Sequence, residues 1–369
     1  MKAVVILPTY NERENIQILL AKLLSVAKGI TNHSLTFLVI DDNSPDGTGA
    51  AVREYQKKHP EIKMLTGPKQ GLGKALLRAV GYATGELKAE VLVQMDADLS
   101  HDPASLPQFF AALDRGANFV VGSRYIPGGS IPHNWGIHRK IFSIVGNAIV
   151  RFGLGYLVIH DWTGGYRLYK REFFEKARNQ LQPYKGYVFQ IAFLHQSVAR
   201  GAKVTEVPIH FTDRRFGHSK IAPAQYIKDV LAYVLSARIR QIFGGNFWKF
   251  CVVGTIGFVI NTLGLEILVK LGAHPAVGGA LGAEFAIISN FILNNAWTFR
   301  QRKITGSRAA AKFLQFNLTS VGAIVIQSGT IWIGTSLTGL STYRWFYILG
   351  VGIGLVWNYL MYSLVIWKK

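Results

Sequence analysis

The sequence predicts an α/β domain built on a parallel sheet, followed by a helical domain embedded in a membrane. In roughly the first two thirds of the chain, short apolar runs alternate with segments of helical length, and charges occur throughout. Beyond Asn246, long apolar runs are separated by short basic or glycine-rich connections. Strands separated by helices of about 10–15 residues are typical of parallel sheets, whereas apolar runs of about 20 residues are long enough to cross a bilayer.

The elements of the α/β domain follow one another in order from the N-terminus. Short apolar runs bounded by turn residues indicate strands, and the segments between them have the length of crossover helices. We expect strands at residues 4–8, 35–41, 62–66, 91–95 and 119–122. We expect helices that start near 11–14 and cover 47–57, 71–82 and 103–116. Ligands of open parallel sheets bind at the carboxyl ends of strands, so polar residues at those ends are the first candidates for a site.

Two acidic pairs stand at the predicted ends of strands. Asp96 and Asp98 leave the strand at 91–95, and Asp41 with Asp42 closes the second strand, at 35–41. Carboxylates this close repel each other unless a cation joins them, and a hard divalent ion that also bridges a diphosphate does so. The alternative for this acidic segment is a solvated turn. A carboxylate at the end of the second strand can also accept hydrogen bonds from a ribose or a base.

Basic residues recur after the fifth strand and in the segments that follow. Guanidinium groups can neutralise a leaving diphosphate and an incoming phosphate, although each of these side chains can equally be a solvated surface residue. The net charge of +20 also suits anionic lipid or phosphorylated small molecules, and a membrane-embedded half makes nucleic acid the poorest of these partners. The basic candidates are Arg124, Arg139, Arg167, Arg214, Arg215 and Lys220.

Four apolar segments in the last third of the chain are long enough to span a bilayer. A run of about 20 residues rising about 1.5 Å each covers the hydrocarbon core. The connection between the second and third segments carries five basic residues. The positive-inside rule therefore places that connection and both termini on the cytoplasmic side. We expect the spans at about 248–271, 276–299, 313–337 and 345–367.

Residues 221–245 mix apolar positions with basic ones, which predicts one or two amphipathic helices lying in the membrane interface. The N-terminal stretch is too short and strand-like for a signal peptide, so we expect the first domain to stay cytoplasmic.

Glu266 and Glu284 lie in the outer parts of the first two predicted spans and leave open a flippase role for a lipid-linked product. The alternative is that the spans only anchor the chain and associate with a second copy.

Several sequence blocks carry a resemblance to a known family. LPTYNERENI, VIDDNSPDGT, QMDADLSHDP, VGSRYIPGG, TGGYRLYKRE, KGYVFQIAFL and EVPIHFTDRRFGHSK occur in this order. They resemble the dolichol- or polyprenol-phosphate mannose synthases of glycosyltransferase family 2, and the last third resembles the GtrA-like four-helix domain. The resemblance implies a GT-A (Rossmann-like) glycosyltransferase domain over 1–220, interfacial helices over 221–245 and a four-helix transmembrane domain over 246–369.

The same resemblance implies an inverting transfer of mannose from GDP-mannose to dolichyl or polyprenyl phosphate, with Mg²⁺ or Mn²⁺ as cofactor. A phosphate acceptor is already anionic at neutral pH, so its attack needs no strong general base. A related polyprenyl-phosphate glucosyl- or GlcNAc-transferase that uses a UDP-sugar remains the alternative, because the contacts that select the base are not visible in the sequence.

The resemblance also assigns residues to the site. Asp96, Asp98 and Ser100 match the metal positions, although some members carry glutamine where this chain has Ser100. The catalytic positions are Asp98, Arg124, Arg139, Arg214 and Lys220, of which Arg139 and Arg214 match contacts to the acceptor phosphate. The implied nucleotide-sugar contacts are Pro8, Tyr10, Glu12, Val39, Asp41, Met95, Asp96, Ala97, Asp98, Arg124, Arg214 and Lys220.

Overall fold

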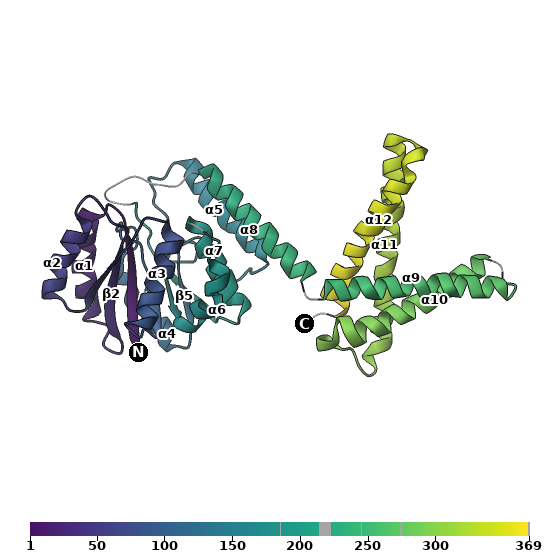
Figure 1. Ribbon diagram of the computed structural model, residues 1–369, viewed down its shortest axis with the longest axis horizontal. Helices are drawn as coiled ribbons and strands as arrows, with labels where there is room; N and C mark the ends of the chain where they lie inside the picture. Colours follow the sequence, from purple (N-terminus) through teal and green to yellow (C-terminus); the bar gives the residue numbers. More distant parts are fainter. Residues whose placement is uncertain (185, 214–222, 245, 274, 368–369) are drawn as a thin grey trace. The chain divides into compact units, whose positions relative to one another are not determined.

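The computed structural model describes residues 1–184, 186–213, 223–244, 246–273 and 275–367. The contacts within the chain divide it into two compact units, Met1–Arg238 and Ile239–Lys369. Figure 1 shows that the first unit is a sheet covered by helices, whereas the described part of the second is helical.

The first unit contains a mixed seven-stranded sheet in the order β3-β2-β1-β4-β6-β5-β7. The strands are β1 (Lys2–Thr9), β2 (Ser34–Asp41), β3 (Ile62–Thr66), β4 (Val91–Gln94), β5 (Phe119–Ser123), β6 (Arg167–Lys170) and β7 (Val204–Pro208). The helices are α1 (Arg13–Ala27), α2 (Thr48–Lys58), α3 (Leu72–Gly85), η1 (Pro103–Ser105), α4 (Leu106–Asp114), α5 (Ile137–Leu154), α6 (Arg171–Leu181), α7 (Gly186–Ala199) and α8 (Pro223–Phe243).

The predicted strands and helices up to residue 122 are confirmed, each within three residues of its expected bounds. The five predicted strands run parallel to one another, and the sheet is mixed because it also contains β6, which was not predicted. β6 runs antiparallel to both of its neighbours, β4 and β5. Its first residue, Arg167, pairs with Val121 near the end of β5, so the chain enters β6 from the carboxyl edge of the sheet. A strand that starts at the edge where the previous strand ended must run back antiparallel to it.

The central strands are buried on both faces, because helices cover each side of the sheet. In β1, Val5 and Leu7 pack with α1 and α4 into one cluster, while Val4 and Ile6 pack with α3 and α7 into the other. This double burial explains why the strands are near-continuous apolar runs. Truncating one such side chain to alanine costs about 2–5 kcal/mol, so this core holds the strand ends at fixed positions.

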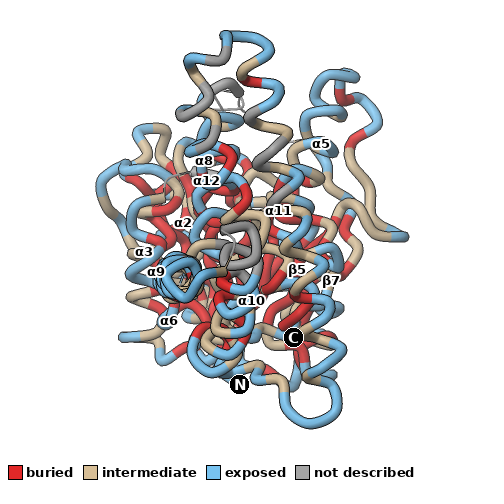
Figure 2. The backbone as a smooth tube through the Cα atoms, turned by 90° about the vertical axis from the view of Figure 1, so that its right-hand side faces the viewer, coloured by how far each residue is buried: buried red, intermediate tan, exposed pale blue. Residues whose placement is uncertain are grey.

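Two helices of the first unit expose apolar side chains beside the sheet. The segment predicted to be interfacial forms one described helix, α8, which buries Tyr233 and Val234 in the core and exposes Leu231 and Leu235. α5, which the sequence analysis did not anticipate, is largely exposed or intermediate in Figure 2. Its exposed apolar residues are Ile137, Ile141, Phe142, Ile144, Val145, Ile149 and Phe152.

The second unit contains α9 (Phe247–Lys270), α10 (Pro275–Leu293), α11 (Arg308–Thr338) and α12 (Tyr343–Met361), with short η helices between and after them. α9 packs on α10 and α11 on α12. Small residues allow these close approaches, since a Cβ on Gly264 would lie 3.1 Å from Gly282 and one on Gly354 would lie 3.3 Å from Ala323.

Among the described residues, two helical segments are long and apolar enough to cross a membrane. They are Phe247–Lys270, with a mean hydropathy of 1.9, and Ile348–Ile366, with 1.6. By length and composition these two segments are candidates for membrane spans, and the expected number of four spans stays a prediction. Glu266 and Glu284 are both exposed on their helices.

Candidate active site

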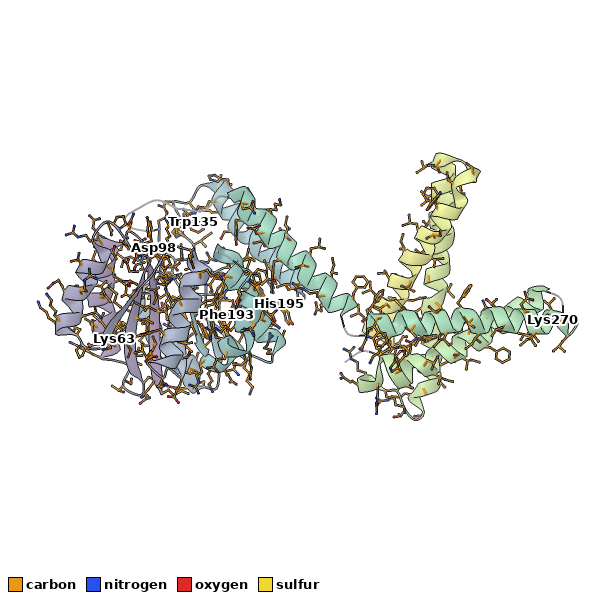
Figure 3. The ribbon with its side chains drawn as sticks, viewed as in Figure 1. Lys63, Asp98, Trp135, Phe193, His195 and Lys270 are labelled. Carbon is orange, nitrogen blue, oxygen red and sulfur yellow. The ribbon has the colours of Figure 1, made fainter. Side chains whose placement is uncertain are left out.

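The candidate site lies at the carboxyl edge of the sheet, on both sides of β1. β2 ends at Asp41 on one side, and β4 leads into Asp96 on the other. Figure 3 shows Asp98 and Trp135 at this end of the first unit. The strand order reverses at β1, which is the position where open α/β sheets bind their ligands.

Asp41 is part of the turn that follows β2. Its carboxylate accepts hydrogen bonds from the Thr9 hydroxyl at 3.2 Å and from the Ser44 hydroxyl at 2.5 Å, and it is 3% exposed. These bonds join the ends of β1 and β2. On the β1 side, the N–H of Glu12 donates to the Thr48 hydroxyl at 3.0 Å, so the turn after β1 is held in the same way.

Two further basic residues at this side, Arg78 and Lys69, were not singled out from the sequence. Arg78 donates a hydrogen bond of 2.6 Å to Asp42, and the Lys69 ammonium lies 3.6 Å from the centre of the Tyr10 ring. Burial raises the pKa of Asp42, although the bond from Arg78 opposes this. Arg78 lies inside α3, where no sequence pattern distinguishes it from a surface arginine.

The acidic segment after β4 forms a tight turn. Leu99 has a φ of 63°, a left-handed conformation that costs a non-glycine residue about 1–3 kcal/mol. Asp98 accepts hydrogen bonds from the Ser100 N–H at 3.1 Å and from its hydroxyl at 2.6 Å. The Asp96 N–H donates to Nδ1 of the buried His101 at 3.0 Å. The turn therefore presents two half-exposed carboxylates with a fixed backbone.

This donor set suits a divalent cation that is shared with a substrate. Among the described residues, no group of three or more His, Cys, Asp or Glu side chains forms a cage for a metal. Mg²⁺ and similar ions are commonly held by one or two carboxylates, with phosphate oxygens and water completing the shell. Asp96, whose side chain is 36% exposed, and Asp98 fit that description. The Ser100 hydroxyl donates to Asp98, and its direct contact with a metal stays a prediction.

Arg124 follows β5 and is held by a buried carboxylate. Its Nε donates to Asp161 Oδ2 at 2.7 Å, and its NH2 group donates to Asp161 Oδ1 and to the Thr163 hydroxyl, both at 2.8 Å. Burial opposes the charged form of Asp161, but Arg124 and the hydrogen bonds hold the pKa of that carboxyl below its ordinary value. Burial likewise opposes the charge on Arg124, and attraction to Asp161 outweighs it and raises the pKa of the guanidinium. Both groups are therefore ionised at neutral pH.

Arg139 lies in the first turn of α5. Its guanidinium is 3.9 Å from the centre of the Trp135 ring and donates to Asp213 at 3.0 Å, while the Trp135 indole N–H donates to the same carboxylate at 2.6 Å. The Arg139 side chain is 48% exposed and remains accessible to an anion. Arg214 and Lys220 lie outside the described residues.

Phe211 joins these groups. Its ring centre lies 5.4 Å from the Arg124 guanidinium carbon, 5.6 Å from the His101 ring and 5.8 Å from the Trp135 ring. The turn after β4, Arg124 and the start of α5 thus converge on one aromatic side chain. Nothing in the FTDRRFGHSK block of the sequence distinguishes this phenylalanine or indicates its role.

Four other residues singled out from the sequence have buried side chains. The expectation that Arg167 faces a phosphate was wrong, because this side chain is fully buried and donates to the carbonyl groups of Trp162, Gly164 and Gln190. Burial lowers the pKa of Arg167 to about 10. The side chains of Val39, Met95 and Ala97 are buried in the core, which leaves their backbone atoms for any contact with a nucleotide.

Comparisons with known proteins agree with this organisation. Residues 4–178 match glycosyl transferase family 2, and residues 249–367 match the GtrA/DPMS transmembrane domain. The chain is 42% identical over 242 residues to the polyprenol monophosphomannose synthase of Mycolicibacterium smegmatis, covering 65% of this chain and 88% of that protein. It is 31% identical over 343 residues to the dolichol-phosphate mannosyltransferase of Pyrococcus furiosus, covering 90% of each.

Among solved structures, one of glucosyl-3-phosphoglycerate synthase from Mycobacterium tuberculosis, in complex with Mn²⁺, UDP-glucose and phosphoglyceric acid, aligns with a TM-score of 0.47. It is 18% identical and covers 64% of this chain and 79% of that one.

The match to the Pyrococcus furiosus protein extends over both units of the chain. The matched family 2 segment contains Asp96, Asp98 and Arg124, and the matched membrane segment starts within α9. The chain therefore belongs to the family of dolichol- and polyprenol-phosphate mannosyltransferases, and it combines a family 2 glycosyltransferase domain of GT-A fold with a GtrA/DPMS transmembrane domain.

Proposed function

We propose that this protein transfers mannose from GDP-mannose to a dolichyl or polyprenyl phosphate with inversion at the anomeric carbon. The observation that carries the proposal is the convergence on Phe211 of Arg124, the turn that bears Asp96 and Asp98, and Trp135 with its partner Arg139. Such a site can hold two anions at once, with carboxylates for a cation on one side and two guanidinium groups on the other.

In the proposed reaction, an oxygen of the acceptor phosphate forms a bond to the anomeric carbon while the bond from that carbon to the GDP oxygen breaks. No proton moves in this step, because the attacking oxygen is already anionic. Asp96 and Asp98 would hold a Mg²⁺ or Mn²⁺ ion, which would supply positive charge next to the leaving diphosphate. Arg124 contacts the diphosphate and sugar, and Arg139 orients the acceptor phosphate. Arg214 and Lys220 remain proposed phosphate contacts of the segment 214–222.

The acceptor carries a long hydrocarbon chain, so the site must be close to lipid. The exposed apolar residues of α5 start in the same helical turn as Arg139. α8 contacts α5 where Val234 meets Gly153, and it exposes apolar residues of its own. We propose that both helices lie in the membrane interface, with the site and both termini on the cytoplasmic side. In this arrangement the acceptor phosphate reaches Arg139 while its chain stays in the bilayer.

Neither of the two alternatives, a UDP-sugar donor or a flippase role for the second unit, receives separate support. The curated relatives are named as mannosyltransferases, which favours mannose over glucose or GlcNAc. Glu266 and Glu284, the residues that left a flippase role open, are exposed on their helices. We propose that the second unit anchors the chain, and that any association between copies occurs through it.

A donor panel tests the proposed function. Purified full-length protein in lipid vesicles with polyprenyl phosphate is incubated with radiolabelled GDP-mannose, UDP-glucose or UDP-GlcNAc, with Mg²⁺, Mn²⁺ or a chelator. We expect label in the lipid fraction from GDP-mannose only, and only when a divalent ion is present. Transfer from a UDP-sugar with none from GDP-mannose would refute the donor assignment, and transfer in excess chelator would refute the metal assignment.

A further inference from the structure

We propose that Asp161 is a positioning residue for the transfer reaction, which holds Arg124 in a fixed relation to the acidic turn after β4. The nature of the reaction rests on the function proposed above. The positioning role itself rests on the contacts of the turn 161–165, which links Arg124 to Asp96.

The contact between Asp161 and Arg124 restrains one edge of the guanidinium. Asp161 is fully buried, the Arg124 side chain is 9% exposed, and their two side-chain hydrogen bonds run in parallel through Nε and NH2. The backbone N–H of Arg124 also donates to Asp161, at 3.1 Å. Among the described residues, no hydrogen bond involves the NH1 group, and we assign this edge to the diphosphate. The carboxylate therefore sets the direction in which Arg124 presents its charge.

The same turn contacts the metal-binding segment. The N–H of Gly164 donates to Asp161 Oδ1 at 3.0 Å, which brings the chain back toward β4. A Cβ on the next residue, Gly165, would lie 3.4 Å from Asp96 Oδ1 and 3.6 Å from the His101 ring. A larger side chain there would occupy the space around the Asp96 carboxylate. One short turn thus sets both the orientation of Arg124 and the surroundings of Asp96.

The side chains of Arg167 and Glu206 stabilise the backbone of this turn. Arg167 donates to the carbonyl groups of Trp162 and Gly164, and Glu206 accepts the N–H of Asp161 at 3.0 Å. The turn cannot move without breaking charged hydrogen bonds in the core. Donors fixed in advance stabilise a charge that develops in a transition state without a reorganisation cost, which is the advantage that Asp161 provides to Arg124.

The first test compares Asp161→Asn with wild type in the full-length protein. The amide keeps the size of the side chain but removes the charge and one acceptor that orient Arg124. We expect kcat to fall roughly 100-fold, while the KM for the donor changes less than about threefold. The matched control is Asp114→Asn, which removes a carboxylate from an ion pair with His33 at the end of α4, away from the site. We expect this control to retain kcat.

The second test asks whether Asp161 acts through Arg124. If it does, Asp161→Asn lowers kcat in the wild type but changes it less than about threefold in an Arg124→Met background, because the group that it positions is gone. If Asp161 only stabilises the fold, the two losses multiply, and the proposal is wrong.

A third measurement starts from a variant that keeps Asp161 and lacks Arg124. Arg124→Ala leaves a buried carboxylate facing the space of the lost guanidinium. We expect millimolar guanidinium chloride to restore part of its activity, and the double variant Arg124→Ala, Asp161→Asn to show no restoration. Equal restoration in both, or none in either, would overturn the positioning role. These assays use whichever donor the wild type turns over, so an error in the proposed donor is detected separately from an error about Asp161.

Discussion

The Phe211 ring lies 5.4 Å from the guanidinium carbon of Arg124. The contact places an aromatic face against a cation that has little access to water, and such contacts contribute about 0.5–2 kcal/mol. Phe211 also touches His101, which holds the turn of Asp96, so a single side chain connects the two charged parts of the site. The contact therefore couples the position of the carboxylates proposed to bind the metal to that of Arg124.

Replacing Phe211 by alanine should weaken both parts of the site together. We expect kcat/KM to fall roughly 10- to 100-fold for donor and acceptor alike, because the packing of Arg124 and His101 loosens at once. Phe211→Tyr, which keeps the ring, should retain most of the activity. Steady-state kinetics of the two variants test this. A loss confined to one substrate would contradict the role of Phe211 as a link.

Asp98→Ala should abolish transfer with little loss of fold. The Asp98 side chain is half-exposed, accepts hydrogen bonds from Ser100 in its own turn, and lies outside the hydrophobic core. We expect activity to fall by at least about 100-fold, since one of two carboxylates for the cation is lost. The thermal unfolding temperature of the purified variant should stay close to wild type. Full activity with GDP-mannose and polyprenyl phosphate would show that Asp98 holds no catalytic ion.

Arg139→Ala should affect the acceptor more than the donor. Removing a charged hydrogen-bond donor to a phosphate costs about 1.5–3 kcal/mol, so we expect the KM for polyprenyl phosphate to rise about 10-fold or more. The KM for GDP-mannose should change less than about threefold. Varying one substrate at a time measures both values. Unchanged dependence on acceptor concentration would remove Arg139 from the acceptor site.

An acidic residue on α5 should interfere with the use of lipid-embedded acceptors. Phe142 is 56% exposed, and placing a carboxylate there opposes insertion of this face into the interface. We expect Phe142→Asp to lower transfer to long-chain polyprenyl phosphate in vesicles roughly 10-fold, which corresponds to the burial energy of one aromatic side chain. Transfer to a short, water-soluble prenyl phosphate should be retained.

The control for this experiment is Gln17→Asp, which introduces the same charge at an exposed position of α1. An equal loss in the control, or no loss in Phe142→Asp, would show that α5 does not contact lipid.

The ion pair of Arg124 and Asp161 should make stability depend on pH only on the acid side. The folded pKa of Asp161 lies below its ordinary value of 3.8, so its stabilising contribution is fully present above about pH 4 and is lost as the pH falls through the folded pKa. The raised pKa of Arg124 adds no change near neutrality, because its contribution is lost only above the ordinary arginine range.

The unfolding temperature of wild type should therefore exceed that of Asp161→Asn by a constant amount from about pH 5 to 8, and the difference should shrink below about pH 4. Thermal unfolding of both proteins in detergent across this range tests the prediction. A difference that varied between pH 6 and 7 would point to a histidine instead.

Local patterns in the sequence were sufficient for much of the fold. Apolar runs bounded by turn residues placed the strands up to Phe119–Ser123, because a strand buried on both faces needs an uninterrupted apolar run. Asp41 and Asp96 come at the ends of two of these strands. The carboxyl ends of parallel strands lie at one edge of the sheet, so both acids were assigned to that edge. β6 was not found, since a four-residue strand with an arginine at its start has no distinctive period.

By itself, the sequence determined that an α/β domain precedes apolar membrane helices and that acidic residues leave its strands, because these features follow from composition and spacing along the chain. Only the tertiary structure decided the roles of Asp161, Arg167 and Phe211. Asp161 lies 37 positions from Arg124, and Arg167 looks like any other arginine until its carbonyl partners surround it. Burial and pairing across the sheet are long-range properties. They make Arg167 a support of the core and leave Arg139 half-exposed at the proposed site.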